Sequence, residues 1–141
     1  MIKLFYNKMV IAIMAMTIFA AALFAQASEI KYGMYSTLEL HEESGDLVGI
    51  EVYITPKKNS GCWVVYMESE GDVEEPVVVP AKITNNTITF DVRRRGNKEK
   101  STFTGTFNAD GYLMGKFADG SKAPDGKDFI KLRRGNGYWQ K

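Results

Sequence analysis

The sequence has one cysteine, Cys62, and one histidine, His41, among its 141 residues. A lone cysteine excludes an internal disulfide, and one histidine with one cysteine falls short of the three or four converging ligands that a metal site needs. Acyl transfer by serine or cysteine uses a nearby histidine as its base, and none lies close to Cys62 in the sequence. We therefore expect Cys62 to be buried and inert, with no metal, no cofactor and no enzymatic activity.

The chain also lacks an excess of charge and any convincing helical periodicity. It has 18 Lys and Arg against 17 Asp and Glu, so no global field steers it towards nucleic acid. Apolar residues alternate with period two between clusters of Gly, Asn, Asp and Pro, which is typical of short strands and turns. We expect an all-β protein that does not bind nucleic acid.

Residues 1–27 have the layout of a secretory signal peptide. Lys3 and Lys8 are their only charges, residues 9–24 are almost wholly apolar, and residues 25–27 read Ala-Gln-Ala, a small-x-small cleavage pattern. The apolar run is shorter than the roughly 20 residues of a spanning helix, the competing interpretation being an N-terminal anchor. We expect an exported protein, in the bacterial periplasm or outside the cell, with residues 28–141 left as one domain free of the membrane.

Eight strands can be drawn through that domain. Consecutive hairpins of this kind make an antiparallel meander, and eight strands suffice to close it into an up-and-down β-barrel without exposed edges. An open β-sandwich or half-barrel is the alternative, and we expect a monomer. The expected strands are 31–41, 47–55, 62–69, 77–84, 87–92, 101–107, 112–117 and 128–133.

Loop lengths fix the register of three hairpins, because apolar residues of both strands must share a face. A two-residue turn at Asn85-Asn86 pairs Ile83 with Ile88, Ala81 with Phe90 and Val79 with Val92. A three-residue loop at Glu43-Ser44-Gly45 pairs Leu40 with Val48, Leu38 with Ile50 and Met34 with Ile54. With a loop at Ala109-Asp110-Gly111, Phe107 opposes Leu113, Phe103 opposes Phe117 and Gly105 opposes Gly115.

The last hairpin places a glycine pair on the inner face, where a strand normally packs side chains. Gly105 and Gly115 are surrounded there by Phe103 and Phe117, among other apolar residues. Such a pair indicates either sharp sheet curvature with an aromatic ring over the gap, or a ligand that approaches the backbone. The sequence favours curvature and leaves the ligand open.

The chain resembles the calycin group of small lipocalin-like and avidin-like barrels. The resemblance rests on the spacing of Gly33-Met34-Tyr35, Gly49, Thr104-Gly105-Thr106 and Leu113-Met114-Gly115 among short hairpins. It implies a barrel that takes a ligand inside or, as some small calycin-like proteins do, inhibits an exported hydrolase. Gly-Met-Tyr stands where lipocalins have Gly-x-Trp, so the resemblance is architectural.

Alternating hairpins place the long loops 70–76, 93–100 and 118–127 at one end of the barrel, with the short loop 43–45. We expect this end to bind, since long loops carry function more often than strands do. Its charged residues pair with each other and with water, or else Arg93, Arg94 and Arg95 hold an anionic group. The other end has tight turns, which we expect Tyr138 and Trp139 to cover unless they meet a partner. The charged candidates are Asp72, Glu74, Arg93, Arg94, Arg95 and Lys98.

The sequence leaves two functions open. In the first, the protein is a binding module that contacts a protein partner through these loops, for example as an inhibitor of an exported hydrolase. Alternatively, it carries or senses a small apolar or amphipathic ligand inside the barrel, lined by Met34, Leu38, Ile50, Val52, Phe90, Phe103 and Phe117. Bulky inward side chains favour the first.

Overall fold

The computed structural model describes residues 32–73, 75–123 and 126–135. The expected signal peptide, Glu74 and the tail with Tyr138 and Trp139 lie outside these ranges. In the described part no helix is long and apolar enough to cross a membrane. The described residues form nine strands: β1 (Gly33–Ser36), β2 (Glu39–Leu40), β3 (Leu47–Pro56), β4 (Cys62–Val73), β5 (Val77–Thr84), β6 (Thr87–Arg93), β7 (Lys100–Phe107), β8 (Tyr112–Phe117) and β9 (Ile130–Arg134).

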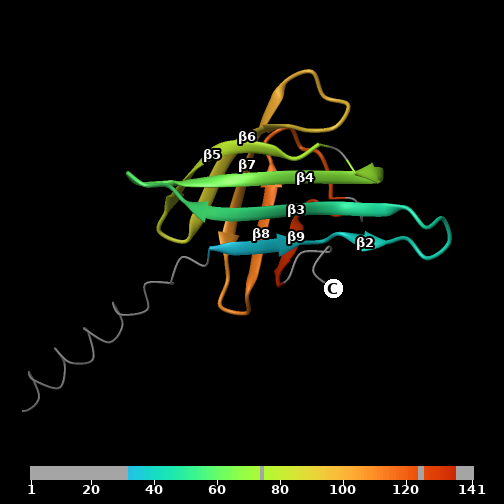
Figure 1. Cartoon of the computed structure of the whole chain (residues 1–141), viewed down its shortest axis with the longest axis horizontal. Helices are drawn as coiled ribbons and strands as arrows, with labels where there is room; N and C mark the ends of the chain where they lie inside the picture. Colours follow the sequence, from blue (N-terminus) through green and yellow to red (C-terminus); the bar gives the residue numbers. More distant parts are fainter. Residues whose placement is uncertain (1–31, 74, 124–125, 136–141) are drawn as a thin grey trace, which may run out of the picture.

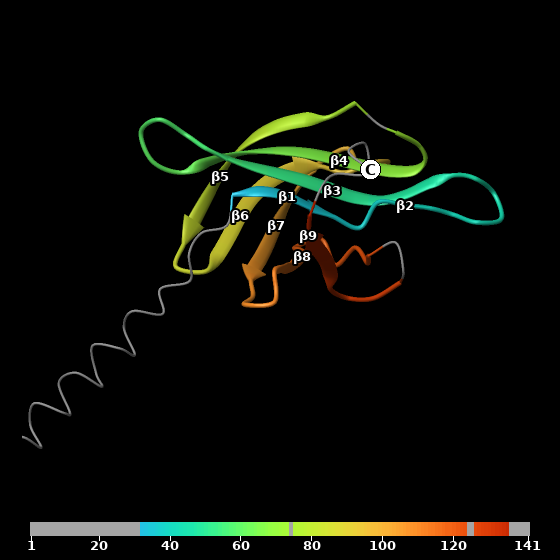
Figure 2. The same cartoon turned by 60° about the horizontal axis from the view of Figure 1, so that its bottom comes forward.

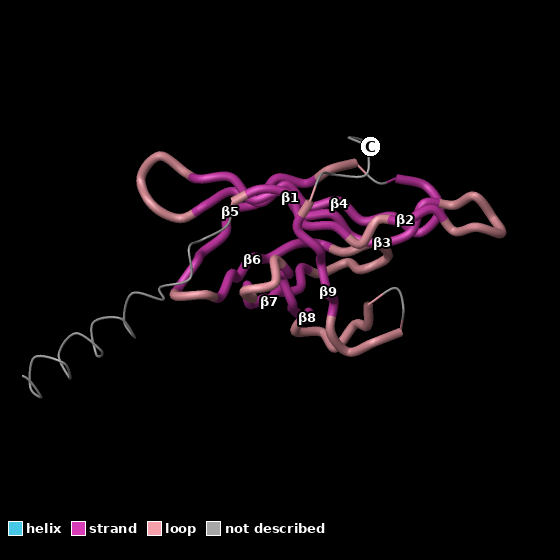
Figure 3. The backbone as a smooth tube through the Cα atoms, turned by 90° about the horizontal axis from the view of Figure 1, so that it is seen from below, coloured by secondary structure: helices cyan, strands magenta, loops and turns pink. Residues whose placement is uncertain are grey.

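The strands form one closed antiparallel barrel. Their order is β1-β9-β8-β7-β6-β5-β4-β3-β2, and a further pairing of β1 with β3 closes the sheet. Strands β1 and β2 both pair with β3 and are two halves of one interrupted strand, so the barrel has eight strands as the sequence predicts. Figure 1 shows the long hairpin of β3 and β4 across the molecule, and Figure 3 shows the sheet curving into two facing layers.

Two of the three predicted hairpin registers are confirmed. Ile83 pairs with Ile88 and Ala81 with Phe90 across a turn in which Asn85 has φ +56°, a left-handed conformation that asparagine tolerates. The β5–β6 pairing covers Ala81 to Thr84, so it does not include the predicted pair of Val79 with Val92. Strands β7 and β8 pair as predicted: Phe103 with Phe117, Gly105 with Gly115, and Phe107 with Leu113.

The register predicted for the first hairpin is wrong by one residue. Leu40 pairs with Leu47 and Met34 with Tyr53, because the turn holds four residues, with the His41 amide donating to the Asp46 carbonyl at 2.7 Å. A shift of one residue exchanges the two faces of a strand. Tyr35 therefore points inward, fully buried, while Met34 faces outward. Leu38 is absent from the main core cluster and is buried instead in a second, smaller one with Leu47 and Met67.

Aromatic rings from several strands pack together inside the barrel. Phe103 stacks on Phe90 with 4.9 Å between ring centroids and meets Phe117 edge-on at 5.2 Å, and Tyr66 lies 6.2 Å from Phe117. The ring of Phe103 also covers the glycine pair, since a Cβ on Gly105 would lie 2.6 Å from Phe103 Cε1. The sequence left open whether an aromatic ring or a ligand lies over the glycine pair, and in the structure the Phe103 ring lies there.

Candidate functional site

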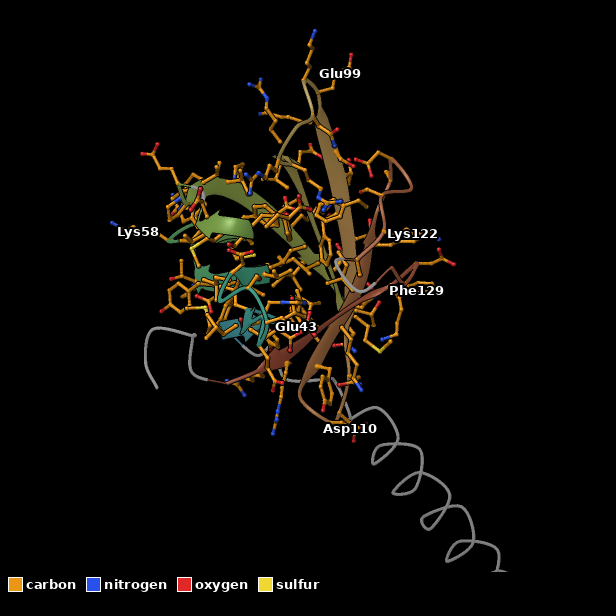
Figure 4. All side chains as sticks on the ribbon, turned by 90° about the vertical axis from the view of Figure 1, so that its right-hand side faces the viewer. Glu43, Lys58, Glu99, Asp110, Lys122 and Phe129 are labelled. Atoms are coloured by element: carbon orange, nitrogen blue, oxygen red, sulfur yellow. The ribbon has the colours of Figure 1, made fainter. Side chains whose placement is uncertain are left out.

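The long loops gather at one end of the barrel, which we call the mouth. Arg95 of the loop 93–100 donates from Nη1 to the Glu70 carbonyl at 3.1 Å, and Asn97 Nδ2 lies 3.4 Å from Asp119 Oδ2. These contacts join the last part of β4 to the loops that follow β6 and β8. The loop predicted at 70–76 is shorter than expected, because β4 continues to Val73. Figure 4 looks onto this end, with Glu43, Glu99 and Lys122 on separate loops, and Figure 1 shows the tight turns at the other end.

A buried polar cluster lies beneath the mouth. Arg94 donates from Nε to Glu68 Oε1 at 3.1 Å, its Nη2 pairs with the same oxygen, and the Tyr66 hydroxyl donates to Glu68 Oε2 at 2.9 Å. Arg94 and Glu68 are 8% and 3% exposed, and the guanidinium lies over the Phe117 ring, 4.6 Å from its centroid. The cluster therefore covers the aromatic core from the mouth side.

The pKa shifts in this cluster are those of a buried, hydrogen-bonded ion pair. Burial lowers the pKa of Arg94, but the hydrogen bond and charge of Glu68 outweigh it and leave the pKa raised. Burial raises the pKa of Tyr66 well above its usual range, and the neighbouring Glu68 carboxylate raises it further. Arg94 thus stays charged and Tyr66 stays protonated near neutral pH.

A cleft of about 400 Å³ opens at the rim of the mouth, between β2 and β9. It has an apolar floor, formed by Val48, Ala123 and Ile130, and polar or charged residues around it. Figure 2 shows β2 and the loop before β9 reaching towards the same side of the barrel. The lining residues are Ser36, Thr37, Glu39, His41, Val48, Gly49, Ala123, Ile130 and Lys131.

The cleft exists because the first strand bends between its two halves. Gly49 has φ +132°, and a Cβ there would lie 2.6 Å from the Thr37 carbonyl oxygen, so the backbones of β1 and β3 touch where a side chain would separate them. Thr37 also makes three hydrogen bonds with Ile50: its amide and its hydroxyl donate to the Ile50 carbonyl at 2.8 and 3.3 Å, and its hydroxyl accepts from the Ile50 amide at 3.0 Å. These contacts hold the strand against β3 and away from β9.

The charged candidates named from the sequence occupy different environments. Arg93 and Asp72 are exposed, and Arg95 is exposed while its backbone amide reaches Glu68 Oε2 at 3.4 Å. Lys98 lines a second cleft of about 490 Å³ with Lys100 and Asp119. Arg94 differs from its neighbours, because its side chain turns inward to Glu68. An Arg-Arg-Arg run does not show which arginine is buried, so this difference is visible only in the fold.

The apolar candidates form part of the core. Phe103 and Phe117 are at most 2% exposed, and Gly105 and Gly115 lie beneath the Phe103 ring. Cys62 is fully buried as predicted, its Sγ 3.7 Å from the Ala81 carbonyl oxygen, and burial raises the pKa of its thiol. Among the described residues, no three His, Cys, Asp or Glu side chains are grouped to hold a metal ion.

The rim cleft is the feature that the sequence analysis missed. Glu39 of β2 and His41 just beyond it line the cleft, whereas the sequence analysis assigned neither of them a role in binding. The signals that bear on the cleft are the short apolar segment between Ser36 and His41 and the isolated Gly49. Neither signal predicts a cleft, because the sequence does not show that β9 is the strand that lies beside β2.

The fold and site define a closed eight-stranded antiparallel β-barrel with a filled interior and a cleft at its rim. This architecture is consistent with calycin-like barrels. No family model matches the chain, and neither the curated proteins nor the solved structures contain a match to it.

Proposed function

We propose that this protein is an exported, non-enzymatic binding module that contacts a protein partner through the mouth of its barrel. The observation that carries the proposal is the Arg94–Glu68–Tyr66 cluster, which covers the core from the mouth side. A ligand bound in the interior would have to displace a buried ion pair, and separating such a pair costs several kcal/mol. Binding at the rim leaves the cluster intact.

The distribution of exposed groups supports the same interpretation. The rim joins an apolar-floored cleft with strand ends and loops that carry both signs of charge, among them Asp72 of β4, Arg93 of β6 and Lys98. Protein interfaces combine an apolar centre with a polar margin. The calycin-like architecture fits this role, since small barrels of that group include inhibitors of exported hydrolases.

Affinity capture from an envelope extract of the producing organism tests the proposal. The variant Arg93→Ala/Lys98→Ala removes two exposed cations from the mouth and keeps Arg94. The matched variant Lys58→Ala/Lys82→Ala removes two exposed cations elsewhere on the surface. We expect the mouth variant to lose the captured protein and the matched variant to retain it. Equal capture by both would place the contact outside the mouth and contradict the proposal.

A small amphipathic ligand is the second candidate, supported by the volume of the rim cleft. About 400 Å³ lies within the range of roughly 300–1,000 Å³ that small-molecule pockets occupy. Native mass spectrometry of protein purified from its own host distinguishes the two functions. A co-purifying mass lost on Ala123→Phe, which fills the cleft floor, would favour the ligand.

A further inference from the structure

At the rim cleft the barrel wall has a gap between β2 and β9, which are neighbours there but do not pair with each other. We call this gap the seam. Strand β1 pairs with β9 through Tyr35–Arg134 and Ser36–Arg133, and the ladder stops there. Beyond that point β2 pairs with β3, and β9 pairs with β8 back to Ile130. Within the described ranges, no backbone hydrogen bond joins residues 37–40 to residues 130–132. Two strand edges therefore face each other across the cleft.

The register shows which peptide groups of β2 point into this seam. The amides of Thr37 and His41 donate to the carbonyls of Ile50 and Asp46 of the β3 hairpin. Because bonding directions alternate along an antiparallel strand, the peptide groups of Leu38 and Leu40 point away from β3, towards β9. The Leu38 amide donates to Ser36 Oγ at 3.0 Å. The groups that remain to bond across the seam are the Leu38 carbonyl and the amide and carbonyl of Leu40.

The same reasoning applies to β9. The Arg134 amide donates to the Gly111 carbonyl on the β8 side, while the Gly135 amide donates to the Met34 carbonyl on the β1 side. Even-numbered residues of β9 therefore bond towards β8 and odd-numbered residues towards the seam. The amide and carbonyl of Lys131 face Leu40 and Leu38 across the cleft.

An extended peptide is the ligand that matches both edges. Its amides and carbonyls project to either side at the spacing of a strand, and its side chains alternate between the two faces. One face of a segment in the seam would rest on the floor of Val48, Ala123 and Ile130, while the other would face solvent. Barrels close in order to remove such edges, so a paired opening in the wall is a place for strand addition.

We propose that the seam between β2 and β9 binds one extended segment of a protein partner through main-chain hydrogen bonds, with a small apolar side chain on the cleft floor. The inference rests on the proposed function and names the part of the mouth that makes the contact. At the seam the partner is recognised by its extended backbone and alternating apolar side chains.

Leu40 provides a matched pair of variants for the test. Its side chain is 54% exposed, and its amide points to the seam and not to β3. Leu40→Pro removes that N–H without removing a bond of the β2–β3 ladder, and Leu40→Ala changes the side chain while keeping the N–H. Urea unfolding of both variants checks that the barrel is intact.

The probe is a phage-displayed library of linear seven-residue peptides, panned on the full-length exported protein. We expect enrichment of peptides with alternating apolar residues, bound at least tenfold more weakly by Leu40→Pro and equally by Leu40→Ala. N-methylation of one recovered peptide at alternate residues should abolish binding. Absence of enrichment, or peptides that bind Leu40→Pro as well as wild type, would overturn the proposal.

Two further outcomes separate this inference from the function on which it rests. If the captured partner depends on Arg93 and Lys98 but binds Leu40→Pro unchanged, the mouth binds through its loops and the seam proposal fails alone. If light scattering shows a dimer that Leu40→Pro dissociates, the seam holds a second copy of this chain, which also overturns the proposal.

Discussion

Arg94 and Glu68, 26 residues apart in the sequence, form a buried ion pair at the mouth of the barrel. Arg94 lies just beyond β6 and Glu68 lies on β4, and the Phe117 ring of β8 packs against the guanidinium. Three strands therefore meet at one polar contact. Its removal affects the core and the binding end together.

Loss of the arginine should destabilise the fold strongly. Arg94→Met leaves the Glu68 carboxylate buried without its cation, which costs about 3–5 kcal/mol. Arg93→Met, one residue earlier and exposed, should change the free energy of unfolding by less than about 0.5 kcal/mol. Urea unfolding measures both. The double variant Arg94→Met/Glu68→Leu removes both charges and should recover most of the loss; a double variant no more stable than Arg94→Met would contradict this account.

The two paired glycines should differ in their tolerance of a methyl group. At Gly105 the Cβ would meet side chains, Phe103 Cε1 at 2.6 Å and Leu113 Cδ1 at 2.8 Å, which can shift. At Gly115 it would meet the Phe103 ring at Cζ and, in addition, backbone that cannot shift as readily, the Thr104 carbonyl oxygen at 2.6 Å and Gly105 Cα at 2.8 Å. Gly105→Ala should cost about 1–3 kcal/mol and Gly115→Ala more.

Two controls accompany these glycine variants. Gly135→Ala should be neutral, because among the described residues no heavy atom beyond its chain neighbours lies within 4 Å of the added Cβ. Phe103→Leu should recover part of the cost at both glycines, because the Phe103 ring is the nearest obstacle to each added Cβ, and it should leave the backbone part of the cost of Gly115→Ala. Equal costs at both glycines in thermal unfolding would show that the Phe103 ring, and not the backbone, limits the space.

The buried thiol should resist modification. Cys62 is fully buried and its pKa is raised by burial, and the thiolate is the reactive form. Native protein at pH 8 should react with a disulfide reagent far more slowly than protein in urea. A reaction as fast as in urea would place the thiol at the surface, and a disulfide-linked dimer formed under native conditions would contradict its burial.

Stability should fall at alkaline pH. Burial raises the pKa values of Tyr66, Tyr35 and Cys62, so the unfolded chain ionises these groups at lower pH than the folded barrel does. Their contribution is complete below the unfolded values of about 8.5 for cysteine and 10 for tyrosine, and it is lost as pH rises above them. Urea midpoints between pH 7 and 11 measure the decline.

Tyr66→Phe tests the origin of that decline. It removes one ionisable group and also the hydrogen bond to Glu68, so it should lower stability at pH 7 and flatten the dependence above pH 10. An unchanged slope would show that Tyr66 does not contribute. Tyrosinate absorbance should rise in two phases, the second coinciding with unfolding.

The sequence by itself determined the number of strands, the β5–β6 and β7–β8 registers and the burial of Cys62. Those features depend on alternation and on turns of two or three residues, where loop length leaves one register that buries the apolar face. The predicted register of the first hairpin was wrong because Leu38 and Leu40 also alternate with polar residues and so indicated the other face of the strand as the buried one. Burying the Tyr35 ring against Phe107, with 5.6 Å between the ring centroids, fixed the other register.

Only the tertiary structure decided which arginine is buried at the mouth and where the barrel wall has an unpaired seam. Which of three adjacent arginines is buried depends on Glu68, 26 residues away, and the seam depends on two strands that lie at opposite ends of the chain. Local patterns report which face of a strand is apolar. They do not report which strand lies beside it, because that choice is made when the whole sheet closes.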